Sequence, residues 1–160
     1  MNNRLINFLN EIGTIMYVGG IFSHIVIGAT LGHETAETAY HVGTYKELSA
    51  YILILPGLAL KLFADLYCYF STKQKPNWLK MKLVMLAFLS VNAFVFLVPM
   101  MPEMVELAKA SIPQGKVSQA YLDKAKIEEL IGMSNALPLL AELVLGSFKP
   151  KLFGERKIKS

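Results

Sequence analysis

The stretch LVMLAFLSVNAFVFLVPMM, Leu83–Met101, decides the fold. It contains no Asp, Glu, Lys or Arg, and Asn92 is its main polar residue. A helix over Leu79–Met101 rises about 1.5 Å per residue, which is enough to cross the roughly 30 Å hydrocarbon core of a bilayer. We therefore expect a membrane-spanning helix here, with Pro99 and Pro102 marking its end.

Three further segments are apolar enough to cross a membrane. Ile12–Leu31 contains no Asp, Glu, Lys or Arg, and Leu48–Phe70 is interrupted by only two charged side chains. Ile127–Phe148 is less apolar because it contains three glutamates. The sequence therefore predicts an all-α fold, a bundle of four transmembrane helices that forms a single domain over residues 1–160.

The composition favours a membrane protein. Hydrophobic residues make up 54% of the chain and charged residues 18%, against about 25% charged residues in soluble domains. The single cysteine, Cys68, excludes an internal disulfide, and the sequence has no zinc-type spacing, phosphate-binding loop or nucleophile triad. The net charge of +4 comes from cations beside apolar segments. We therefore expect the lipid bilayer, and not nucleic acid, as the partner.

Basic residues gather between the second and third spans and after the fourth. They are Lys73, Lys75, Lys80, Lys82, Lys149, Lys151, Arg156, Lys157 and Lys159. The connection after the first span has only Lys46 beside three glutamates. Cytoplasmic connections carry an excess of Lys and Arg, so both termini are expected in the cytoplasm. The expected location is the cell membrane, which is the inner membrane if the protein is bacterial.

The segment between the third and fourth spans mixes charged and apolar residues. We expect Glu103–Lys126 to be a loop with short amphipathic helices, broken at Ile112–Gly115. A cleaved signal peptide is the alternative interpretation of Met1–Leu31. Its apolar run, however, is longer than the roughly 7–15 residues of a typical signal core.

One face of the first span carries a distinctive set of side chains. They are Gly13, Tyr17, Gly20, His24 and Gly28, which follow one another at intervals of 4, 3, 4 and 4 residues. One interpretation is close helix packing through small residues, with His24 bonded across the interface. A second is a haem b or porphyrin site, with His24 as the metal ligand and Gly20 and Gly28 leaving room for the macrocycle. A third is proton handling by His24.

No second histidine lies at the depth of His24, because His33 and His41 belong to the outer end of the span and the following connection. A haem would therefore be ligated by one histidine, or by His24 and a methionine. Candidate methionines are Met16, Met85 and Met133. The histidine that binds the cofactor would then be His24 or His33.

Four charged residues lie inside the expected spans. They are Lys61, Asp65, Lys82 and Glu142. Lys61 and Asp65 are four residues apart and can neutralise each other on one helix face. All four lie within about 15 Å of the cytoplasmic surface, counted along their helices. We expect a buried ion-pair cluster that joins spans two, three and four, either as a structural network or as a proton or anion path.

Three stretches resemble one superfamily of small membrane proteins. They are YILILPGLALKLFADLY (Tyr51–Tyr67), NWLKMKLVMLAFLSVN (Asn77–Asn92) and MSNALPLLAELVLGSFKPKL (Met133–Leu152). The chain is similar in them to the HemJ-type protoporphyrinogen oxidases and the related CopD-like four-helix proteins. The resemblance implies a haem-bearing, redox-active and often oligomeric membrane protein.

On matching motifs, Lys82 takes the place of the family's lysine in span three and Asn135 that of its asparagine in span four. The resemblance implies a catalytic role for both. His33 falls near the family's histidine after span one. The resemblance thus implies a membrane oxidoreductase that acts on a porphyrinogen or a quinone-like partner.

Two other functions remain open. One is that of an accessory or scaffolding membrane subunit, in which the glycine face only packs helices. The other is that of a proton-coupled transporter that uses the four charged residues. A homo-oligomer or a partner in a membrane complex is expected in either case.

Overall fold

The computed structural model describes residues 3–32, 34–73 and 75–152. Over these residues the chain forms four long helical rods, each long and apolar enough to cross a membrane. The predicted all-α bundle of four spans is confirmed. The elements are α1 (Asn3–Leu31), α2 (Ala36–Ser49), the π-helical segment Ala50–Ile54, α3 (Leu55–Ser71), α4 (Asn77–Val91), the π-helical segment Asn92–Leu97, α5 (Val98–Ser111), the short 3-10 helix Ile112–Gln114 and α6 (Gln119–Phe148).

The sequence pattern predicts that the third rod ends at its prolines, and the structure differs from this prediction. The rod continues as α5 to Ser111, with Pro99 in the first turn of α5 and Pro102 inside it. The π-helical segment provides the reason, because the N–H of Val98 bonds back five residues to the C=O of Ala93. The wider turn accommodates a proline that has no N–H to donate.

The second rod has the same construction. The N–H of Leu55 bonds to the C=O of Ala50, and Pro56 follows in the first turn of α3. Each proline-bearing rod is therefore continuous, and α2 lengthens the second span beyond the predicted start at Leu48.

The segment Glu103–Lys126, expected to be a loop with short amphipathic helices, is helical on both sides of its break, but these helices are continuous with the spans. Its first part completes α5, and its last part begins α6. The break at Ile112–Gly115 is confirmed, with Gly115 in the left-handed conformation at φ 71°. Ser118 then caps α6, because its hydroxyl accepts a hydrogen bond from the N–H of Tyr121 at 3.3 Å.

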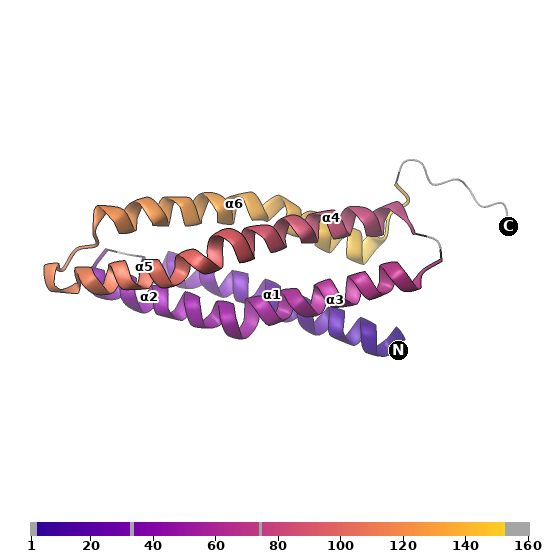
Figure 1. The fold of residues 1–160 in the computed structure, drawn as a ribbon, viewed down its shortest axis with the longest axis horizontal. Coiled ribbons are helices and arrows are strands. Elements are labelled where there is room, and N and C mark those ends of the chain that lie inside the picture. The colour runs from indigo at the N-terminus through magenta and orange to yellow at the C-terminus, as the bar shows by residue number, and fades with distance from the viewer. Residues whose placement is uncertain (1–2, 33, 74, 153–160) are drawn as a thin grey trace.

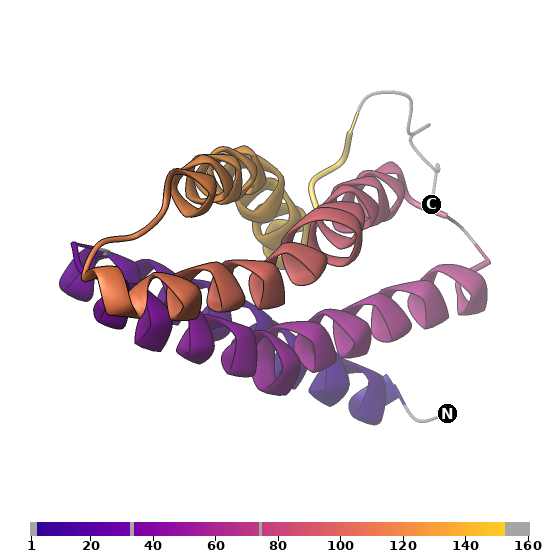
Figure 2. The same cartoon turned by 60° about the vertical axis from the view of Figure 1, so that its left-hand side comes forward.

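The rods pack in neighbouring pairs (Figure 1). α1 lies along α3, α2 along α5, and α4 along α6. The rod made of α4 and α5 crosses from α2 to α6, as Figure 2 shows. The start of α1, the α3–α4 connection and the end of α6 share one end of the bundle, the basic end. The α1–α2 and α5–α6 connections share the other end, the loop end.

The outer surface of the bundle is apolar. Leu137 and Phe148 are each 78% exposed and Phe70 is 74% exposed. Such side chains are unfavourable in water but suit a hydrocarbon environment, in which helices also satisfy every backbone hydrogen bond internally. The protein is a small multi-pass integral membrane protein, and its surroundings are a lipid bilayer. The expected cytoplasmic orientation of the basic end stays a prediction.

Candidate functional site

The backbones of α1 and α3 approach each other closely at two glycines. A Cβ placed on Gly13 would lie 2.8 Å from the carbonyl oxygen of Gly57, and one placed on Gly57 would lie 2.5 Å from the backbone nitrogen of Tyr17. Only glycine permits this backbone contact. The crossing brings Thr14 to Lys61, whose Nζ donates a hydrogen bond to the Thr14 hydroxyl at 2.8 Å.

Lys61 belongs to a buried group of four charges, which we call the charge centre: Lys61, Asp65, Lys82 and Glu142. Nζ of Lys61 lies 3.0 Å from Oε1 of Glu142. Nζ of Lys82 lies 2.7 Å from Oδ1 of Asp65 and 3.3 Å from the same Glu142 oxygen. The charge centre therefore joins α3, α4 and α6, and through Thr14 it reaches α1.

The pairing within the charge centre differs from the one that sequence spacing suggested. Of the ion pairs between described residues, none joins Lys61 to Asp65, although they lie one turn apart on α3. Each lysine pairs with a carboxylate from another helix. The reason is burial. Side chains that point into the helix interface lie closer to groups on the facing helices than to groups on their own helix.

The charge centre is shielded from the surroundings of the protein. The four side chains are between 0% and 4% exposed, with Glu142 at 0%. Three carboxylate oxygens, Oδ2 of Asp65 and both oxygens of Glu142, have no hydrogen-bond partner among the described residues. Oε1 of Glu142 nevertheless lies within ion-pair range of both lysines. Buried polar atoms are usually bonded, and intramembrane charges are expensive unless they are paired.

Gly146 makes room for one member of the charge centre. A Cβ at this position would lie 3.2 Å from Cε and 3.3 Å from Nζ of Lys82. The stem of Lys82 therefore passes directly over Gly146 on its way from α4 to Glu142.

A second polar contact lies nearer the middle of the bundle. Nδ2 of Asn92 donates a hydrogen bond to Oδ1 of Asn135 at 2.6 Å and also lies 3.4 Å from the Ser134 hydroxyl. Asn92 begins a π-helical segment, and Asn135 lies on α6. Asn135, which the resemblance paired with Lys82 as catalytic, thus belongs to a different layer of the bundle from Lys82.

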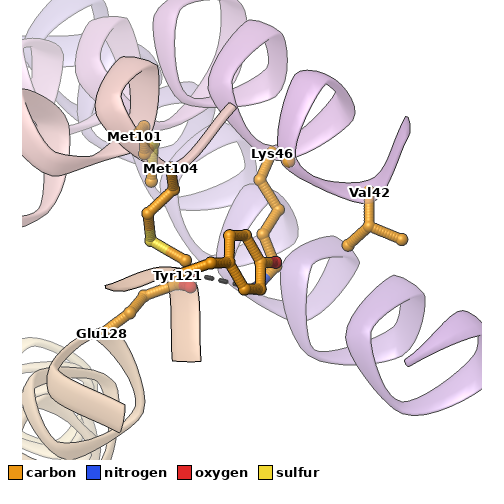
Figure 3. A pocket seen from close by; sticks show the side chains of 7 residues that line it. Val42, Lys46, Met101, Met104, Tyr121 and Glu128 are labelled. Carbon is orange, nitrogen blue, oxygen red and sulfur yellow. Dashed lines mark hydrogen bonds and ion pairs between the residues drawn. The ribbon is translucent and has the colours of Figure 1, made fainter. Parts of the chain in front are cut away.

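A third polar contact lies toward the loop end. Nζ of Lys46 is 2.9 Å from Oε1 of Glu128, and we call these two residues the outer pair. A small pocket surrounds the outer pair, as Figure 3 shows, with the ring of Tyr121 beside it and Met101, Met104 and Val42 along its wall.

The three polar contacts follow one line along α6. Glu128, Asn135 and Glu142 are seven residues apart in sequence, so they share one helix face at steps of about 10 Å. Each meets a side chain from a different part of the bundle. The sequence prediction did not group these three residues as one set, and it did not include Lys46 and Glu128 among the site residues. The seven-residue repeat of polar side chains was the signal that could have found them.

The face around His24 packs against helices. Nε2 of His24 hydrogen-bonds with the Ser49 hydroxyl on α2. A Cβ on Gly20 would lie 2.5 Å from Cγ1 of Ile54, and one on Gly28 would lie 3.9 Å from the end of Lys46. Ile54 of the second rod thus packs against Gly20, and Lys46 reaches Gly28. These contacts are of the kind that the helix-packing interpretation predicts.

The described residues contain no group of three or more His, Cys, Asp or Glu side chains that could hold a metal ion. His33, the second candidate ligand, lies outside the described residues.

Comparison of the chain with family models, with curated proteins and with solved structures found no match. The fold and the site therefore define the protein by themselves. It is a four-span α-helical membrane protein whose interior holds an ion-paired charge centre.

Proposed function

We propose that the protein transfers protons within the membrane and that the charge centre is the site at which protons bind and leave. One observation carries the proposal. Two lysines and two carboxylates lie buried together, and among the described residues Oδ2 of Asp65 and both carboxylate oxygens of Glu142 have no hydrogen-bond partner. Ionisable residues inside a membrane are rare, and proton relays and ion pathways are among the functions that they serve.

The charge balance supports this function. With all four groups ionised, the charge centre has two positive and two negative charges and a net charge of zero. Moving a proton from Lys82 to Asp65 leaves that net charge unchanged, so both forms avoid an isolated charge in a low-dielectric interior. The unpartnered oxygens of Asp65 and Glu142 accept a proton without losing an existing hydrogen bond.

The line of polar contacts on α6 supplies a route to and from the charge centre. The Asn92–Asn135 contact lies about two helical turns from Glu142, and the outer pair lies about two turns further. Together the three contacts extend over about 20 Å, which is most of the hydrocarbon thickness. Tyr121, beside the outer pair, adds a hydroxyl near the loop end.

Proton flux into proteoliposomes tests the proposal. The full chain is reconstituted with a pH-sensitive dye inside the vesicles, and a potassium gradient with valinomycin drives the flux. We expect Asp65→Asn to reduce flux to the level of protein-free vesicles. Glu106→Gln is the matched control, because the Glu106 side chain is 74% exposed and lies outside the charge centre. Equal flux in the wild type and Asp65→Asn would overturn the proposal.

A variant in which all four residues of the charge centre are replaced by apolar residues distinguishes a role in proton transfer from a purely structural role. In the variant Lys61→Met, Asp65→Leu, Lys82→Met, Glu142→Leu no buried charge is left unpaired, so the fold should be kept. We expect this variant to purify as the wild type does and to show no flux. Retained flux would mean that protons follow a route that avoids the charge centre.

The resemblance to HemJ-type oxidases supports a second candidate function, with the charge centre taking up protons released when a porphyrinogen-like substrate is oxidised by a quinone-like acceptor. The observation that favours it is the position of Lys82, which contacts both carboxylates. Haem b is the cofactor that this function implies. An absorption spectrum after expression with ample haem tests it. A Soret band that is lost in His24→Ala would support it, and absence of a band in the wild type would exclude it.

A further inference from the structure

An open groove runs along the first turns of α4 at the basic end. It is lined by Asn77, Lys80, Met81 and Val84 of α4 and by Leu152 beyond α6. The four α4 residues follow helical spacing and form one face, polar at the start and apolar one turn later. This face is distinct from the one that carries Lys82, which is buried.

The chain beyond α6 forms the second wall of the groove. α6 ends at Phe148 and is capped by Lys149, a non-glycine residue in the left-handed conformation at φ 45°. The N–H of Lys149 bonds to the C=O of Leu145 at 3.1 Å. Pro150 follows and cannot continue the helix. The turn directs the chain back toward α4, so that Leu152 reaches the groove.

Within the described residues, the segments that flank the groove carry charges of one sign. The basic residues near it are Lys73, Lys75, Lys80, Lys149 and Lys151. Residues 66–81 and 143–152 contain no Asp or Glu. The Nζ of Lys80 lies 3.4 Å from Oδ1 of Asn77 and is exposed at the mouth of the groove.

Aromatic residues place this end at the boundary of the membrane. The Nζ of Lys75 lies 4.5 Å from the ring centroid of Tyr69, and that of Lys149 lies 5.8 Å from the ring centroid of Trp78. Tyr and Trp favour the level of lipid headgroups, where lysines also reach the phosphates. The polar mouth of the groove is therefore at headgroup depth and its apolar part, Met81 and Val84, at acyl-chain depth.

The geometry points to a binding site for one anionic phospholipid, with its phosphate at Lys80 and one acyl chain along Met81 and Val84. The positive charges on the described segments that flank the groove select a lipid of net negative charge over a zwitterionic one. The exposed apolar floor, with Met81 at 47% and Val84 at 58% exposure, matches an acyl chain and has no counterpart in a soluble phosphate. The site is separate from the charge centre and does not depend on proton transfer.

Native mass spectrometry of the full chain tests this site. The protein is released from nanodiscs of phosphatidylcholine and phosphatidylglycerol, and the retained lipids are counted. We expect wild type to keep phosphatidylglycerol in preference to phosphatidylcholine and Lys80→Gln to lower that preference about fivefold. Lys116→Gln, at the loop end, is the matched control and should change nothing. Lys80 is exposed, so its substitution should leave the fold intact.

Three results would overturn the inference. They are equal retention of both lipids by wild type, an equal effect of Lys80→Gln and Lys116→Gln, and release of phosphatidylglycerol by millimolar inorganic phosphate. The last result would assign the groove to a soluble anion. A second variant, Val84→Asn, probes the apolar floor and should lower retention of phosphatidylglycerol without altering its preference over phosphatidylcholine.

Discussion

The charge centre and the outer pair both connect α6 to other helices through ion pairs, but they differ in burial. The side chains of the charge centre are at most 4% exposed, whereas those of Lys46 and Glu128 are 15% and 19% exposed. The charge centre also connects two cations to two anions, while the outer pair is a single contact. The same residue types therefore contribute very differently to the free energy of unfolding in the two places.

Burial decides that contribution. A partly exposed ion pair can lose one member because its partner recovers contact with polar surroundings, so its contribution is small. A buried group cannot recover such contact, and the loss of one member leaves an uncompensated charge. The predictions below test this difference, from the largest expected effect to the smallest.

Glu142→Gln should destabilise the protein by about 3–5 kcal/mol, because it leaves Lys61 and Lys82 with one carboxylate between them. Glu128→Gln should reduce stability by less than about 1 kcal/mol. Unfolding in mixed micelles of increasing SDS fraction measures both free energies. Equal losses in the two variants would show that burial does not separate the charge centre from the outer pair.

Gly57→Ala should lower stability by about 1–3 kcal/mol, because the added methyl group meets the α1 backbone and forces apart the crossing that holds Thr14 against Lys61. The same unfolding assay applies. Gly19→Ala is the control, since a Cβ there meets nothing within 4 Å, and it should cause no loss. A harmless Gly57→Ala would contradict the close crossing.

Asn92→Leu should cost about 0.6 kcal/mol, the typical contribution of a neutral interhelical hydrogen bond in a membrane. The effect lies below that of Glu142→Gln because Asn135 carries no charge. Adding Asn135→Leu should recover part of the loss, since no unpaired amide then remains. A loss as large as that of Glu142→Gln would show that the middle layer is coupled to the charge centre.

Gly146→Ala should have the smallest effect on stability, about 0.5 kcal/mol, because the flexible stem of Lys82 needs to move by only a few tenths of an ångström. Proton flux should nevertheless fall below that of Gly132→Ala, a control position with nothing within 4 Å. Identical proton flux in the two variants would show that proton transfer does not require an exact placement of Lys82.

Much of the fold could be predicted from the sequence, and the same holds for the membership of the charge centre. Long apolar segments can lie in a bilayer only as helices, so the four spans follow from composition. Lys61, Asp65, Lys82 and Glu142 stand out because they interrupt those segments. Proline misled the prediction at Pro99, because a π-helical turn allows a span to continue where composition suggests an end.

The tertiary structure alone decided which groups meet. Sequence spacing could pair Lys61 only with Asp65 on its own helix, whereas the fold pairs it with Glu142 from α6. The glycines around His24 could equally make room for a cofactor or for a helix, and only the fold shows that Ile54 packs against Gly20. The physical reason is that lipid dictates the helical form of each segment, but the rotation and depth of each helix depend on contacts with the others.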